Sequence, residues 1–254
     1  MNPVQALGRG TLSLLQSLGA MTLFAGRTFA AFAGPFHAGQ LGLQLLRIGF
    51  LSLPVVGLTA LFTGAALALN IYVGGARFNA ESFVPNIVAL GIVRELGPVI
   101  AALMLAGRVS SGIAAEIGAM RATEQIDALH TLTIDPVRYL IVPRVLAGII
   151  VLPLLVMVAN VIGVFGGFLV GVNSLGFDPT VYIRNSWDIL ESWDIVSGLI
   201  KAGVFGFLLT LMGCYHGYHA EGGAQGVGRA ATHAVVSAAM LIFAANFIVT
   251  SLFV

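Results

Sequence analysis

The hydrophobic and polar positions divide the chain into long apolar runs separated by short polar connections. A run of about 20 mostly apolar residues is long enough to cross a bilayer as a helix. Four runs qualify clearly, and a fifth qualifies although it contains a lysine. They cover about Leu45–Val73, Asn86–Gly107, Val145–Val172, Ile195–Tyr215 and Ala230 to the C-terminus. The pattern therefore predicts an all-α integral membrane protein with five transmembrane helices.

The first 36 residues differ from these runs, because polar or small residues recur there at helical spacing. The positions are Arg9, Ser13, Gln16, Ala20, Arg27 and Ala31. Such a face favours an amphipathic helix in the membrane interface, ended by Gly34-Pro35 and followed by a five-span domain over residues 37–254. A sixth span and a signal peptide are the alternatives. The signal peptide is disfavoured because Arg27 interrupts the apolar core before the cleavage-like Ala31-Phe32-Ala33.

Composition and charge agree with a membrane protein. Only 9% of the 254 residues are charged, against about 25% in soluble domains, and the net charge of +1 gives no reason to expect nucleic acid. With the N-terminus cytoplasmic and the C-terminus outside, the basic residues favour the inner side, as membrane proteins require. Arg9, Arg27, Arg47, Arg108, Arg121, Arg138, Arg144 and Arg229 then lie inside, and Arg77 and Arg184 outside.

Two connections contain helix signals. Outside, Asp178-Pro179 resembles an N-cap followed by proline, which predicts a short interfacial helix over about 178–188. Inside, Ser110–Val142 is the longest polar connection. Thr123 is expected to cap a short amphipathic helix ending near Thr131, and Asp135-Pro136 to begin the next helix. The short helix either lies flat on the membrane or docks into a groove of a soluble partner.

Ionic residues lie within the apolar runs. A charge at the bilayer centre is costly, so it usually faces a cavity or a partner. Arg94 lies eight residues beyond Asn86, and Lys201 eight beyond Trp193, which puts both roughly 12 Å below the outer boundary. Asp194 lies two turns from Lys201 on the same helix face. We expect these residues to meet in one layer of the membrane.

Glu95 and Pro98 add to this layer. Pro98 has no N–H, so the carbonyl of Arg94 loses its helical donor and the helix should kink beside the charges. Arg94 and Glu95 point about 100° apart and cannot both face one partner. Two interpretations remain. The charges either line a functional polar site or form a structural ion pair, Arg94–Glu95 or Glu95–Lys201, that locks helices together.

Three smaller features of the sequence predict no additional functional site. Ala159, Gly163, Gly167 and Gly171 form a stripe that lets a helix approach closely, either within the chain or across a dimer. His216 and His219 have metal-like spacing, but no cysteine or carboxylate accompanies them, so no metal site is expected. The single cysteine, Cys214, excludes an internal disulfide and is expected to be a small packing residue.

Three motifs carry a family resemblance. They read RELGPVIAALMLAGR, AEIGAMRATEQIDAL and DPVRYLIVPR. The chain resembles the MlaE/YrbE family of ABC-transporter permeases, densely over Arg94–Pro153 and more thinly from about His37 to the C-terminus. The resemblance implies five spans preceded by an interfacial helix, a homodimer, and a coupling helix, about 121–131, that binds a cytoplasmic ATPase. The implied coupling residues are Arg121, Glu124, Gln125, Asp127 and Leu129.

The resemblance also implies the cargo and its site. The cargo is phospholipid moving between the inner and outer membranes, which maintains outer-membrane lipid asymmetry. A periplasmic hexamer of MCE-domain subunits and, in some systems, a STAS-domain subunit complete the assembly in the bacterial inner membrane. Arg94, Glu95, Asp194 and Lys201 match polar cavity positions, and Leu67, Tyr72 and Phe78 match its wall or rim. Asn70 departs from the usual glutamine, and Gly74 and Gly75 replace bulkier residues.

The leading hypothesis is therefore a lipid-translocating permease without enzymatic activity or cofactor. The only lysine, Lys201, is followed by alanine, so the chain has no Walker A sequence and ATP hydrolysis must come from another subunit. A proton-coupled secondary transporter that uses Glu95 is the alternative, although no internal repeats support it. An intramembrane enzyme is disfavoured, because neither HExxH nor GxSxG occurs.

Overall fold

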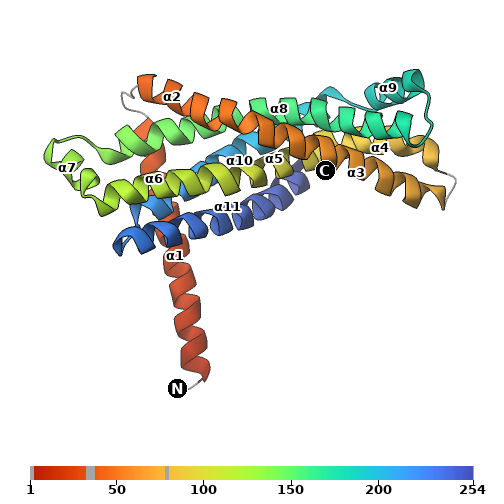
Figure 1. Cartoon of the computed structure of the whole chain (residues 1–254). Helices are drawn as coiled ribbons and strands as arrows, with labels where there is room; N and C mark the ends of the chain where they lie inside the picture. The colour runs from red at the N-terminus through yellow and green to blue at the C-terminus, as the bar shows by residue number, and fades with distance from the viewer. Residues whose placement is uncertain (1–2, 33–37, 78–79, 254) are drawn as a thin grey trace.

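The computed structural model describes residues 3–32, 38–77 and 80–253, which form helices joined by short turns (Figure 1). Within these ranges, five helical stretches are long and apolar enough to cross a membrane. They are Gly39–Ala76, Glu81–Ala122, Val137–Asn173, Ser192–Tyr218 and Gly223–Phe253. Each coincides with one of the five apolar runs, so the predicted all-α, multi-pass architecture is confirmed.

Several of these stretches consist of more than one helix. The first contains α2 (Ala38–Ile48), the short 3-10 turn η1 (Phe50–Ser52) and α3 (Leu53–Ala76). The second contains η2 (Glu81–Phe83), α4 (Val84–Gly91), η3 (Ile92–Leu96), α5 (Gly97–Leu105), η4 (Ala106–Ser110) and α6 (Ser111–Ala122). The third joins η5 (Val137–Ile141) to α8 (Val142–Asn173), and the last two are α10 (Ser192–Tyr218) and α11 (Gly223–Phe253). Of these, η3, η4 and η5 are π-helical turns.

The second stretch extends well past its apolar run. It contains 42 residues, or about 60 Å of helix, which is roughly twice the hydrocarbon thickness of a bilayer. The first part of the polar connection after Ser110 is therefore a continuation of the spanning helix. This continuation carries α6 away from the apolar middle of the bundle to the short helix α7 (Gln125–Thr131).

The N-terminal helix α1 (Pro3–Phe32) runs across the long helices and leaves the bundle near the end that carries α6 and α7 (Figure 1). Its buried residues Phe24, Thr28 and Ala31 hold it against the bundle, with the Phe24 ring centroid 5.5 Å from that of Tyr215. Exposed leucine and phenylalanine side chains cover other parts of the helix. The crosswise course fits an interfacial helix, and its position in the membrane stays a prediction.

Of the three predicted helix caps in the two connections, two are confirmed and one is wrong. The Asp178 side chain accepts hydrogen bonds from the N–H groups of residues 180 and 181 and caps α9 (Pro179–Asp188). Asp135 likewise accepts from the Val137 N–H at 3.0 Å. The prediction for Thr123 is wrong, because its hydroxyl bonds back to the Ala119 carbonyl at 2.9 Å. Glu124, in the left-handed region at φ 59°, precedes α7 instead.

The glycine stripe of α8 packs within the chain. Gly64 of α3 approaches the backbone of Gly163 so closely that it has no room for a side chain, and a Cβ on Gly163 would lie 3.1 Å from a methyl carbon of Ile92. Further along, the Tyr182 ring of α9 fills the space beside Gly171. Burial raises the pKa of the Tyr182 phenol to about 12, so it stays neutral at physiological pH. The stripe therefore seats α3 and α9 on α8.

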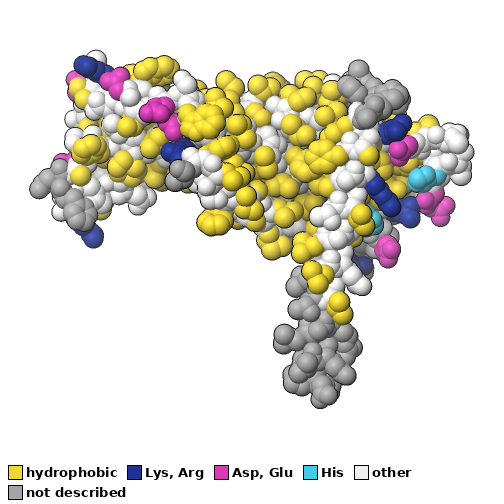
Figure 2. Space-filling model, turned by 180° about the vertical axis from the view of Figure 1, so that it is seen from behind, with side chains coloured by type: hydrophobic (Ala, Val, Ile, Leu, Met, Phe, Trp, Pro, Cys, Tyr) yellow, Lys and Arg dark blue, Asp and Glu magenta, His cyan; other side chains and the backbone are white. Residues whose placement is uncertain are grey.

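The surface seen from behind is apolar along the middle of the bundle, and charged side chains gather toward its two ends (Figure 2). Large exposed hydrophobic side chains include Phe62 of α3, Phe165 of α8 and Phe243 of α11. An apolar belt between charged ends is the surface expected of a protein that spans a bilayer.

Candidate intramembrane polar site

Polar side chains from three elements meet within the apolar bundle. The π-helical turn η3 contributes Arg94 and Glu95, and α10 contributes Asp194 and Lys201. The prediction that ionic residues of two spans meet is thus confirmed for these residues, which we call the ionic cluster. Helix α11 adds two uncharged residues, Asn246 and Thr250, as described below.

Pro98 shapes the backbone at this point. Because its nitrogen cannot donate, the helix widens into the π-turn η3, and the Gly97 N–H bonds to the Ile92 carbonyl instead. The freed carbonyl of Arg94 accepts a hydrogen bond from Lys201 Nζ at 3.1 Å. The predicted loss of the helical donor at Arg94 is therefore confirmed, and a side chain from the neighbouring helix replaces that donor.

Lys201 is fully enclosed by its partners. Its Nζ lies 2.6 Å from Glu95 Oε1, and its side chain is 1% exposed. The close approach of α10 to η3 depends on Gly198, one turn earlier, where a Cβ would lie 2.6 Å from the Val93 carbonyl oxygen. The Glu95–Lys201 pair therefore ties two spans together, as the structural interpretation of the charges requires.

Glu95 also binds α11. The Asn246 amide donates to Glu95 Oε2 at 3.2 Å, and the Thr250 hydroxyl donates to Oε1 at 3.2 Å. Sequence reasoning missed both residues. Their four-residue spacing puts them on one face of an apolar helix. This spacing was the only sequence signal for the pair, and it indicates a site only once Glu95 is known to face these residues.

Arg94 is held more loosely. Its guanidinium Nη1 lies 3.7 Å from Asp194 Oδ1, and its side chain is 33% exposed. Asp194 is itself fixed, because its Oδ2 accepts the Glu191 N–H at 3.1 Å in a capping box at the start of α10. An arginine has five N–H donors. The geometry therefore leaves Arg94 as the cation of the ionic cluster that is available to an anion from outside.

The expected wall residues lie next to η3 on the α3 side. Leu67 and Tyr72 are half-buried and pack against the small cluster Ala68, Val84, Val88 and Ile92. The Tyr72 ring meets the Phe177 ring edge-on, with centroids 6.1 Å apart. Phe78 lies outside the described residues. The role of these residues as the wall or rim of a cavity stays a prediction.

The expected coupling residues lie in α7 or shortly before it. Arg121 Nη1 and Asp127 Oδ1 form an ion pair at 2.7 Å, and the Gln125 amide donates to the Thr123 hydroxyl at 3.0 Å. Glu124, Gln125 and Asp127 are exposed, whereas Leu129 packs against the main core. The helix thus presents a polar outer face and is anchored by an apolar inner one.

The two histidines have local partners, and Cys214 is buried. His216 Nε2 lies 2.9 Å from the Ser237 hydroxyl, and His219 Nδ1 lies 2.9 Å from the Tyr215 carbonyl oxygen. Cys214 is a buried free thiol, as a packing residue should be.

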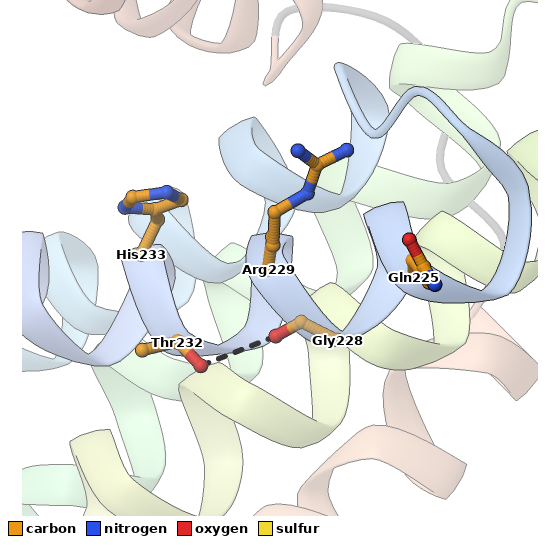
Figure 3. A pocket seen from close by; sticks show the side chains of 5 residues that line it. All are labelled: Gln225, Gly228, Arg229, Thr232 and His233. Atoms are coloured by element: carbon orange, nitrogen blue, oxygen red, sulfur yellow. Dashed lines mark hydrogen bonds between the residues drawn. The ribbon is translucent and has the colours of Figure 1, made fainter.

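A depression of about 490 Å³ lies on the first turns of α11, lined by Gln225, Gly228, Arg229, Thr232 and His233 (Figure 3). The Arg229 and His233 side chains project from one face of the helix, and the Thr232 hydroxyl donates to the Gly228 carbonyl at 3.2 Å. None of the residues expected at the cargo site or the coupling helix lines this depression. It is therefore separate from the ionic cluster.

Comparisons with known proteins agree on one family. The family described as "Permease MlaE" matches residues 41–252. A "Probable ABC transporter permease protein" of Rickettsia felis is 49% identical over 257 residues, which cover 100% of this chain and 98% of the relative. The "Intermembrane phospholipid transport system permease protein MlaE" of Haemophilus influenzae is 36% identical, covering 99% and 97%. "Protein TRIGALACTOSYLDIACYLGLYCEROL 1, chloroplastic" of Arabidopsis thaliana is 37% identical, covering 87% and 63%.

Proposed function

The chain belongs to the MlaE permease family, and on that premise we propose that it is the membrane-spanning subunit of an ABC transporter that moves phospholipids between the inner and outer membranes. In this role it maintains outer-membrane lipid asymmetry. It lies in the bacterial inner membrane with its N-terminus cytoplasmic and its C-terminus periplasmic. The arginine-rich end that carries α6 and α7 then faces the cytoplasm.

The assembly that we propose contains two copies of this chain. A separate ATPase subunit docks on the polar outer face of α7 and hydrolyses the ATP, so this chain has no enzymatic role. A hexamer of MCE-domain subunits receives or supplies lipid on the periplasmic side, and a STAS-domain subunit is a further candidate partner. The names of the Rickettsia and Haemophilus relatives support the ABC-transporter assignment.

The observation that carries the cargo proposal is the unequal accessibility of the two cations. Arg94 is 33% exposed and Lys201 is 1% exposed. A guanidinium binds a phosphate oxygen pair well. We therefore assign contact with the lipid phosphate to Arg94. Lys201 and Glu95 hold η3 and α10 in place, and Asp194 keeps Arg94 oriented while the site is empty.

ATP-driven closure of the two ATPases would press on α7 and move the two permease halves relative to one another, as rigid-body switches do. Glu81–Ala122, which includes η3 and α6, is one helical stretch, and a short turn joins it to α7. A displacement of α7 is therefore transmitted along this stretch to the ionic cluster. The movement changes the space beside Arg94, and lipid is admitted or expelled.

Transport in vesicles tests this proposal. The chain is reconstituted with its ATPase and periplasmic partners, and transfer of a labelled phospholipid is followed with ATP, with a non-hydrolysable analogue, or with an imposed pH gradient. We expect transfer that depends on ATP hydrolysis and is indifferent to the gradient. Transfer driven by the gradient without ATP would instead identify a proton-coupled transporter that uses Glu95.

A further inference from the structure

A second polar site lies at the end of the bundle that carries α7, away from the ionic cluster. It is a groove of about 390 Å³, a volume in the range of about 300–1,000 Å³ that is typical of ligand sites. The end of α1, the end of α7, the start of η5 and the end of α10 all contribute to it. Its polar lining residues are Arg27, His130, Asp135, Arg138 and Tyr218.

The charges in this groove do not balance. Two arginines face a single carboxylate, since Arg138 Nε lies 3.6 Å from Asp135 Oδ2. Asp135 also accepts the Val137 N–H, so its oxygens are shared with the backbone. Among the residues that the structure describes, Arg27 has no carboxylate within ion-pair distance. Arg27, Arg138 and Asp135 together leave the groove with one uncompensated positive charge.

The surroundings indicate what kind of anion fits. Leu23, one turn before Arg27 on the same side of α1, is 70% exposed. Figure 2 shows basic, histidine and acidic side chains gathered beside α1 where it leaves the bundle, with apolar surface next to them. A basic pocket bordered by apolar membrane-facing surface suits a lipid headgroup better than a soluble ion.

We propose that this basic groove binds the phosphate-bearing headgroup of an anionic membrane lipid, with Arg27 and Arg138 as its binding residues. The acyl chains lie along the side of α1 that carries Leu23. Binding there fastens α1 to the start of η5 and the end of α7, and so makes the position of the coupling segment sensitive to the lipid around it. This site is separate from the cargo site, because none of its residues belongs to the ionic cluster.

Native mass spectrometry of the full-length chain in detergent tests the proposal. Retention is compared for phosphatidylglycerol and phosphatidylcholine with identical acyl chains, and inorganic phosphate is added as a competitor. We expect the chain to prefer phosphatidylglycerol. The double variant Arg27→Gln/Arg138→Gln should lower the apparent affinity for phosphatidylglycerol by about tenfold and abolish the preference. Lipid held at the ionic cluster is common to all variants, so the difference between them reports the groove.

Two further variants make the result decisive. Arg184→Gln, which removes an exposed arginine paired with Asp188 at 3.5 Å on α9, should leave the preference unchanged. Asp135→Asn keeps an N-capping side chain but removes the competing charge, so it should strengthen phosphatidylglycerol binding even if the double variant fails to fold. An unchanged preference in the double variant, or in Asp135→Asn, would overturn the proposal. Displacement of the lipid by millimolar phosphate would reassign the groove to a soluble anion.

Discussion

At the scale of single residues, the two cations of the ionic cluster have different roles. Lys201 has two of its three donors engaged, by Glu95 and by the Arg94 carbonyl, and is closed to solvent. Arg94 meets one carboxylate at 3.7 Å and remains partly open. An enclosed pair fixes helices, whereas an open cation can change partners. The structural and functional interpretations of these charges therefore apply to different members of the cluster.

This difference predicts that one substitution lowers stability and that another lowers lipid binding. Lys201→Met leaves Glu95 without its cation, and should lower stability by about 2 kcal/mol, seen as a lower thermal unfolding midpoint in detergent. Adding Glu95→Gln should restore most of the loss. Arg94→Gln should keep the midpoint but reduce retained phospholipid by about tenfold. If Lys201→Met kept the midpoint and lost the lipid, Lys201 would be a cargo ligand.

At the scale of elements, prolines explain much of the irregular helix geometry. Two π-helical turns precede a proline closely, η3 before Pro98 and η5 before Pro143. In each case the proline cannot supply the usual donor and the backbone widens. In η3 the freed carbonyl recruits Lys201, so the break in the helix becomes part of the site. The same continuous segment leads through α6 to the exposed face of α7.

The proposed docking role of α7 gives a test at this scale. Asp127→Arg replaces an exposed carboxylate that pairs with Arg121 at 2.7 Å, and should reduce recovery of the ATPase with a tagged chain by at least about fivefold. Asp188→Arg is the matched control. It reverses an exposed, arginine-paired carboxylate on α9, and should leave recovery unchanged. Equal recovery with both variants would count against docking at α7.

At the scale of the whole molecule, the sequence predicted the spans, the caps at Asp178 and Asp135, and the meeting of Arg94 with Asp194 and Lys201. The spans follow from apolar length, the caps from the Asp-Pro pattern, and the meeting from equal helical depths in two spans. It did not predict that Asn246 and Thr250 bind Glu95, because the role of a polar residue in a span depends on which residues face it. Nor did it identify Thr123 as a residue that bonds back into α6, since a threonine near a helix boundary satisfies either role.

The central claim is that Arg94 holds the phosphate of the cargo in the membrane. A cryo-EM map of the chain purified with its native partners and lipids tests it most directly. We predict lipid density beside η3, with a phosphate oxygen about 2.8 Å from the Arg94 guanidinium and Lys201 still bound to Glu95. A map in which apolar packing seals Arg94 from lipid, with the lipid phosphate bound elsewhere, would contradict the account.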